Sequence, residues 1–117
     1  MTIIVGLTGG IASGKSTIIN YIKKNRIPTH DSDFVVNKLY TNPTKKFLKY
    51  LKNAKIKYTI NKKKIDKASI REEIFYNLKK KNLLEKYIHN EVKTSRDIFL
   101  KKHKIKKTKL IFLDIPL

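Results

Sequence analysis

The residues with the clearest chemical pattern lie near the N-terminus, in the stretch GGIASGKS from Gly9 to Ser16. Its glycines, lysine and hydroxyl residue have the spacing of a phosphate-binding loop, and it stands between an apolar run and a helix-like stretch. Glycine permits torsions that point successive N–H groups at an anion, and the start of a helix adds positive charge. The pattern therefore predicts a nucleoside triphosphate site.

In such a site we expect Lys15 to bridge the β- and γ-phosphates and the Ser16 hydroxyl to bind Mg²⁺. Thr17 offers a further donor near the α-phosphate. The loop alone does not specify whether the γ-phosphoryl group goes to water, to a small molecule or to a protein.

Two carboxylates, Asp31 and Asp33, follow a short apolar run that we predict to be the second strand. In a parallel sheet they would lie at the same edge as the loop, where a carboxylate can orient an acceptor hydroxyl and take its proton. Asp33 also stands where a helix N-cap is expected. The spacing leaves both interpretations open.

A third acid, Asp114, ends the apolar run from Leu110 to Leu113. In a phosphate-loop protein an Asp at this place commonly approaches Mg²⁺, directly or through water. The alternative is a turn-forming residue ahead of Pro116. His89 falls in a helix-like stretch, and no second His is placed to share a metal with it.

The charge of the chain is strongly positive, with 28 Lys and Arg against nine Asp and Glu. Attraction of an anionic nucleotide and a nucleic-acid surface are both compatible with this excess. General Lys-rich composition also explains it, and the scarcity of Arg and of aromatic residues among the Lys runs disfavours nucleic acid. The chain has no Cys and no membrane-length apolar run, which favours a cytoplasmic protein without a membrane partner.

The order of predicted elements is strand, helix, strand, several helices and a final strand. The strands are expected over residues 3–7, 27–30 and 110–114, and the main helices over 16–24, 33–40, a stretch starting at Pro43, 66–75 and 82–103. Asp66 is the expected N-cap of the fourth of these helices. We assign residues 53–64 no structure. This order indicates an α/β fold, a parallel sheet of the phosphate-loop NTPase type flanked by helices, with a helical insertion.

Several separate stretches resemble dephospho-CoA kinases. They are IVGLTGGIASGKST, HDSDFVVNKLY, KIDKASIREEIF, LEKYIHNEV and LDIPL, and they occur in the family's order along all 117 residues. The resemblance implies ATP-dependent phosphorylation of the ribose 3′-hydroxyl of dephospho-CoA. It implies residues 1–40 and 108–117 as a nucleotide-binding core, and 41–107 as a mostly helical substrate-binding region, within one domain.

The resemblance also implies roles for single residues. Asp33 and Lys15 would be catalytic, with Asp31 supporting Asp33, and Arg71 and His89 would contact the acceptor's phosphates. Mg²⁺ would lie near Ser16 and Asp114. The ATP phosphates would be bound by Gly10, Ala12, Ser13, Gly14, Lys15, Ser16 and Thr17.

The chain also departs from the family pattern. His30 replaces an apolar residue, Ser32 an Ala, and Asn90 a Pro. Leu117 falls inside the family's D-x-P-L-L-F-E motif, so we expect a chain that lacks the C-terminal part of the domain and has reduced or no activity. The other functions that the sequence permits are a nucleoside monophosphate-type kinase and a basic nucleic-acid-binding NTPase.

Overall fold

The computed structural model describes residues 1–8 and 14–115, and the chain divides into two compact units. The first unit comprises Met1–Asp33 and Lys93–Leu117, and the second comprises Phe34–Val92. Among the described residues, no helix combines the length and the apolar character that a membrane crossing requires.

The first unit is built on a three-stranded sheet of β1 (Ile3–Leu7), β5 (Leu110–Asp114) and β2 (Thr29–Asp31), in the order β1-β5-β2. Both pairings are parallel, with Leu7 and Asp31 in register with Asp114. The carboxyl ends of all three strands therefore meet at one edge, which confirms the predicted parallel sheet. The run LIFLD forms its central strand, and its continuous apolar sequence suits a parallel strand whose two faces are covered by helices.

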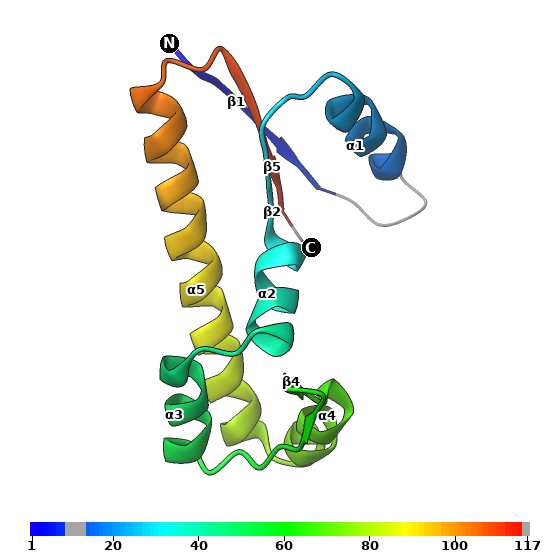
Figure 1. The fold of residues 1–117 in the computed structure, drawn as a ribbon, viewed down its shortest axis with the longest axis vertical. Coiled ribbons are helices and arrows are strands. Elements are labelled where there is room, and N and C mark those ends of the chain that lie inside the picture. The colour runs from blue at the N-terminus through cyan, green and yellow to red at the C-terminus, as the bar shows by residue number, and fades with distance from the viewer. Residues whose placement is uncertain (9–13, 116–117) are drawn as a thin grey trace. The chain divides into compact units, whose positions relative to one another are not determined.

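Two helices flank this sheet. Figure 1 shows α1 (Lys15–Lys24) and the C-terminal end of α5 (Leu78–Ile105) on opposite sides of the strands. Gly14 precedes α1 with a φ of 82°, which glycine adopts without the steric cost that a Cβ would bring. Ile22 of α1 is buried, whereas Ile18, one turn earlier in the helix, is 43% exposed.

The second unit is mostly helical. It contains most of α2 (Ser32–Thr41), then α3 (Lys45–Asn53), a hairpin of β3 (Ile60–Asn61) and β4 (Lys64–Ile65), α4 (Lys67–Phe75) and the first part of α5. Its buried core is one cluster that draws on the helices and the hairpin: Leu39, Tyr40, Phe47, Leu51, Ile56, Ile65, Ile70, Leu84 and Tyr87.

Two helices of this unit, α3 and α4, begin directly after a residue whose side chain caps the helix N-terminus. Thr44 accepts a hydrogen bond from the Phe47 N–H at 3.1 Å, and Asp66 accepts one from the Ala68 N–H at 3.1 Å. The predicted cap at Asp66 is confirmed. Pro43, expected in the first turn of α3, instead lies before the Thr44 cap, because the threonine hydroxyl oxygen can accept a backbone hydrogen bond.

Two elements differ from the prediction by two residues or more at one end or both, and one segment was left unassigned. β2 covers Thr29–Asp31 rather than residues 27–30, and α5 runs from Leu78 to Ile105 rather than over residues 82–103. Residues 53–64, which we left unassigned, include the last residue of α3, the strand β3 and the first residue of β4. The usual Asn-Gly turn signal is absent there, because Lys62 and Lys63 occupy the two turn positions with φ of 52° and 65°.

Replacing Lys63 with Gly should stabilise the chain. In the left-handed conformation, steric contact of the Cβ costs the folded state about 1–2 kcal/mol, and Gly avoids this cost. Gly also loses more backbone entropy on folding, which offsets about 0.5–1 kcal/mol of that gain. We therefore expect Lys63→Gly to raise the free energy of unfolding by about 0.5–1 kcal/mol in urea denaturation. Lys64→Gly, in the strand β4, should not stabilise; equal gains from both variants would contradict the explanation.

Candidate active site

Three carboxylates gather at the carboxyl edge of the sheet. Asp31 ends β2, Asp33 lies in the first turn of α2 and Asp114 ends β5, and one oxygen from each lies within 4.8 Å of the others. Asp114 is buried, whereas the other two are exposed. The sequence placed Asp31 and Asp33 at the carboxyl edge of a parallel sheet, and the structure adds that Asp114 lies beside them there.

Of the two interpretations left open for Asp33, the helix N-cap is wrong, because α2 begins one residue earlier, at Ser32. Asp33 is therefore already helical, and its charge is favoured by the positive end of the helix. The Ser32 hydroxyl is not directed to the helix either. It donates a 3.1 Å hydrogen bond to the backbone carbonyl of Asp114, and Ser32 is buried. This bond joins the start of α2 to the end of β5, and no local sequence signal indicated it.

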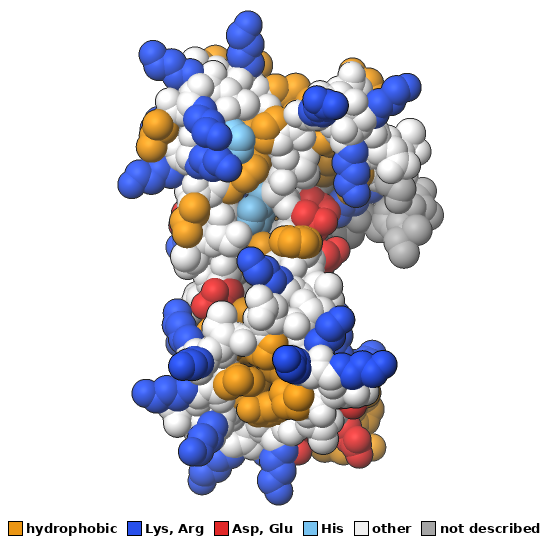
Figure 2. Space-filling view, in the orientation of Figure 1, with side chains coloured by type: hydrophobic (Ala, Val, Ile, Leu, Met, Phe, Trp, Pro, Cys, Tyr) orange, Lys and Arg blue, Asp and Glu red, His pale blue; other side chains and the backbone are white. Residues whose placement is uncertain are grey.

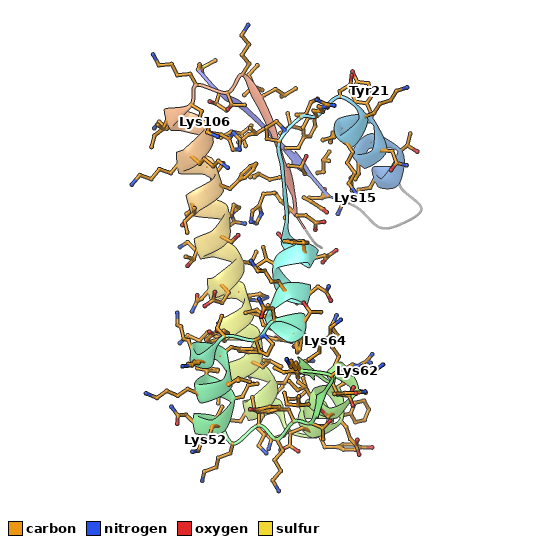
Figure 3. The ribbon with its side chains drawn as sticks, in the orientation of Figure 1. Lys15, Tyr21, Lys52, Lys62, Lys64 and Lys106 are labelled. Carbon is orange, nitrogen blue, oxygen red and sulfur yellow. The ribbon has the colours of Figure 1, made fainter. Side chains whose placement is uncertain are left out.

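Lys15 forms an ion pair with Asp114 through its ammonium group and Oδ1. Both side chains are largely buried, with 16% and 10% of their surface exposed. Figure 3 places Lys15 at the start of α1, beside the ends of the strands. From the sequence we expected separate partners for these residues, phosphate for Lys15 and a metal ion for Asp114. The ion pair between them was not predicted, because the sheet brings the two residues together and local spacing does not indicate it.

His30 is buried immediately before the acids. Its Nε2 shares a 3.0 Å hydrogen bond with the Ser95 hydroxyl of α5, and its ring lies 5.6 Å from that of Phe99. Burial lowers the pKa of His30, and the positive charge of Arg96 lowers it further, although Asp31 opposes this. His30, which stands where the family pattern has an apolar residue, thus places an imidazole with a lowered pKa between β2 and α5.

Acidification should destabilise the fold through His30. Because the pKa of the folded-state imidazole lies below its ordinary value of 6.5, the unfolded chain binds the proton more readily, and stability falls as pH drops below that value. Burial, with Lys102 and Lys106, also lowers the pKa of His103, so His30 accounts for only part of the loss.

This prediction is measured by urea denaturation from about pH 7.5 to about pH 5.5. His30→Gln should lose less stability over this interval than the unaltered chain. His89→Gln, at an exposed position of α5, is the control. A His30→Gln variant that loses as much as the unaltered chain would rule out this origin.

The remaining predicted site residues have three outcomes. Gly10, Ala12, Ser13 and the Ser16 side chain lie outside the described part of the chain. Gly14 precedes α1, and Thr17 is exposed on it. Arg71 on α4 and His89 on α5 are both exposed, and both belong to the second unit, whereas Lys15 and the three acids belong to the first.

The fold and the site together define a class of protein. A parallel α/β sheet has a GxxxxGKS sequence between its first strand and first helix, and it gathers Lys15 with three carboxylates at its carboxyl edge. These are the features of a phosphate-loop nucleotide-binding protein.

Comparison with known proteins gives the family. A sequence model described as dephospho-CoA kinase matches residues 3–117, and the chain therefore belongs to the dephospho-CoA kinase family. A dephospho-CoA kinase of Oryza sativa subsp. japonica is 34% identical over 97% of this chain and 50% of the relative. One from Bacillus anthracis is 28% identical over 100% of this chain and 58% of the relative.

A solved structure agrees with this assignment. The dephospho-CoA kinase from Campylobacter jejuni is similar with a TM-score of 0.72 and 28% identity, over 99% of this chain and 58% of that one. The chain thus spans about half the length of the curated relatives it matches.

Proposed function

We propose that the protein transfers the γ-phosphoryl group of ATP to the ribose 3′-hydroxyl of dephospho-CoA, giving coenzyme A and ADP. Membership of the family supports this reaction. The single observation that carries it is the ion pair of Lys15 with Asp114 beside Asp31 and Asp33, which brings a phosphate-binding cation and candidate bases to one sheet edge.

In this proposal Lys15 and the loop hold the phosphates, with backbone contacts from Gly10, Ala12, Ser13 and Gly14 and a further donor from Thr17. The ammonium of Lys15 would leave Asp114 for the β- and γ-phosphates when ATP binds, since a phosphate carries more charge than one carboxylate. Asp33 would accept the proton of the acceptor hydroxyl, with Asp31 supporting its orientation.

The donor atoms fit a divalent cation of the Mg²⁺ type. Carboxylate oxygens are the hard ligands that Mg²⁺ prefers, and Asp114 supplies a buried one with two other acids close by. We propose that Asp114 and the Ser16 hydroxyl hold the ion together with ATP. When bound, it would neutralise the charge that develops on the transferred phosphoryl group.

The acceptor is proposed to lie between the γ-phosphate and Asp33, with its own phosphates near Arg71 and His89. Both residues are exposed and therefore accessible to a ligand. A cytoplasmic location is part of the proposal and is supported by the absence of Cys from the chain.

The test is product analysis by mass spectrometry after incubation with ATP, Mg²⁺ and dephospho-CoA. One arm uses the 117-residue chain. A second joins it to the part of the Campylobacter jejuni enzyme beyond the matched region. We expect coenzyme A and ADP from at least the second arm, and none from the matching Lys15→Ala variant.

Two other functions are tested by repeating the assay with AMP as the acceptor, and with RNA or DNA added. Phosphorylation of AMP but not of dephospho-CoA would indicate a nucleoside monophosphate-type kinase. ATP hydrolysis stimulated by RNA or DNA, with steep salt dependence, would indicate a nucleic-acid-binding NTPase. Either result would replace the proposed reaction.

A further inference from the structure

A broad open pocket of about 1040 Å³ lies in the second unit, along α3 and the segment that follows it. Four of its lining residues are lysines, Lys49, Lys52, Lys55 and Lys57, and all four are exposed. Their ammonium groups repel one another, and a bound anion would relieve that repulsion. This pocket has no part in the proposed phosphoryl transfer.

The other lining residues are apolar or aromatic. Leu48 and Tyr58 are half-buried, and Ile56 is almost fully buried, with 2% of its surface exposed. Leu48 and Tyr58 also pack against the buried core of the unit, so this lining is held in place. The pocket thus combines a fixed apolar floor with a charged rim.

The backbone at the end of α3 explains why Ile56 is buried while its neighbours Lys55 and Lys57 are exposed. The N–H of Ile56 donates to the carbonyl of Leu51 at 2.9 Å, and the N–H of Lys55 donates to that of Lys52 at 3.0 Å. Lys55 has a φ of 58°, the left-handed conformation that ends many helices. This turn directs Ile56 into the core and leaves Lys55 and Lys57 at the rim.

Acidic residues are absent from this part of the sequence. Between Asp33 and Asp66 the chain has ten Lys and no Asp or Glu. Lys and Arg side chains are spread widely over the face shown in Figure 2, so charge alone would single out no site. What distinguishes this pocket is that its lining combines four exposed lysines with apolar side chains and contains no carboxylate.

We propose that this pocket is a second ligand site, for a small organic phosphate with an apolar or aromatic part. The phosphate would contact the lysine rim, and the apolar part would cover Leu48 and Tyr58. The volume of the pocket is of the order that small-molecule sites have. A single aromatic residue, Tyr58, does not supply the series of stacking surfaces that single-stranded nucleic acid uses.

Three probes separate the contribution of the phosphate from that of the apolar part. They are 1-naphthyl phosphate, which has both parts, inorganic phosphate, which has only the anion, and 1-naphthol, which has only the rings. Binding is measured by calorimetry in the Lys15→Ala background, which weakens phosphate binding at the loop. We expect the Kd of 1-naphthyl phosphate to be at least about tenfold lower than that of either other probe.

The variants test the location. Replacing the four rim lysines with Gln, as Lys49→Gln, Lys52→Gln, Lys55→Gln and Lys57→Gln, should raise the Kd of 1-naphthyl phosphate by about tenfold or more. The matched control removes the same charge from α5 and its end in the first unit, as Lys101→Gln, Lys102→Gln, Lys104→Gln and Lys106→Gln. Tyr58→Ala should weaken binding of 1-naphthyl phosphate but not of inorganic phosphate.

Equal losses in the two lysine variants would show general charge attraction and overturn the proposal. So would inorganic phosphate binding as tightly as 1-naphthyl phosphate. An RNA oligonucleotide that displaces the probe and binds far more tightly would assign the surface to nucleic acid instead. The test measures binding in a Lys15→Ala background, so a negative result would not count against the proposed kinase reaction. A negative result in the kinase assay would likewise not count against this second site.

Discussion

Replacing Asp33 with Asn is expected to lower kcat for dephospho-CoA phosphorylation by about 10²–10⁴-fold while changing ATP affinity little. The amide has nearly the shape of the carboxylate but cannot accept the proton of the acceptor hydroxyl. Asp33 is exposed, and one of its oxygens lies within 4.8 Å of oxygens of Asp31 and Asp114, so the substitution alters charge without opening a cavity in the core. Steady-state kinetics measures kcat, and calorimetry with ATP measures the affinity. Both use whichever protein is active in the product assay, the 117-residue chain or its fusion to the C-terminal part of the Campylobacter jejuni enzyme.

Two further variants give this prediction its controls. Asp97→Asn removes the same charge from an exposed position of α5 in the first unit and should leave kcat unchanged. Asp31→Asn should reduce kcat less than Asp33→Asn, because Asp31 is proposed only to support the base. A larger loss at Asp31 would exchange the two roles, and an unchanged kcat at Asp33 would remove it from the mechanism.

The parts of the fold that the sequence predicts are those with strong local patterns. The runs IIVGL and LIFLD are continuously apolar, a composition typical of parallel strands. LIFLD is largely buried, as expected, whereas Ile3 and Ile4 of IIVGL are exposed. The loop motif located the start of α1 to within one residue, and Asp66 marked the start of α4 through its capping side chain. The meeting of Asp31, Asp33 and Asp114 follows from the rule that parallel strands end at one edge.

What the sequence did not predict depends on contacts between distant residues. The Lys15–Asp114 ion pair, the Ser32–Asp114 hydrogen bond and the His30–Ser95 hydrogen bond each join elements that are far apart in the chain. Side-chain type restricts such partners but does not identify them. The β3–β4 hairpin was missed for another reason, since Lys62 and Lys63 occupy positions at which Asn and Gly are the expected signal.

Replacing Phe47 with Ala should be the most destabilising single change among the predictions made for this chain. Phe47 is fully buried, its ring stacks on that of Tyr87 at 5.1 Å and meets the edge of Tyr40 at 6.0 Å, and it joins α2, α3 and α5 in the second unit. Removing the ring leaves a cavity between three helices that cannot close without moving their backbones, and such changes cost about 3–5 kcal/mol.

A domain with about 5–15 kcal/mol of total stability would lose a large fraction of it, so urea denaturation should show a strongly lowered midpoint in Phe47→Ala. Phe75→Ala makes the same chemical change at a side chain that is 73% exposed, and it should alter stability by no more than about 0.5 kcal/mol. The contrast between the two variants depends only on burial, because the atoms removed are identical. Similar losses in both would mean that the core of the second unit is not organised around Phe47.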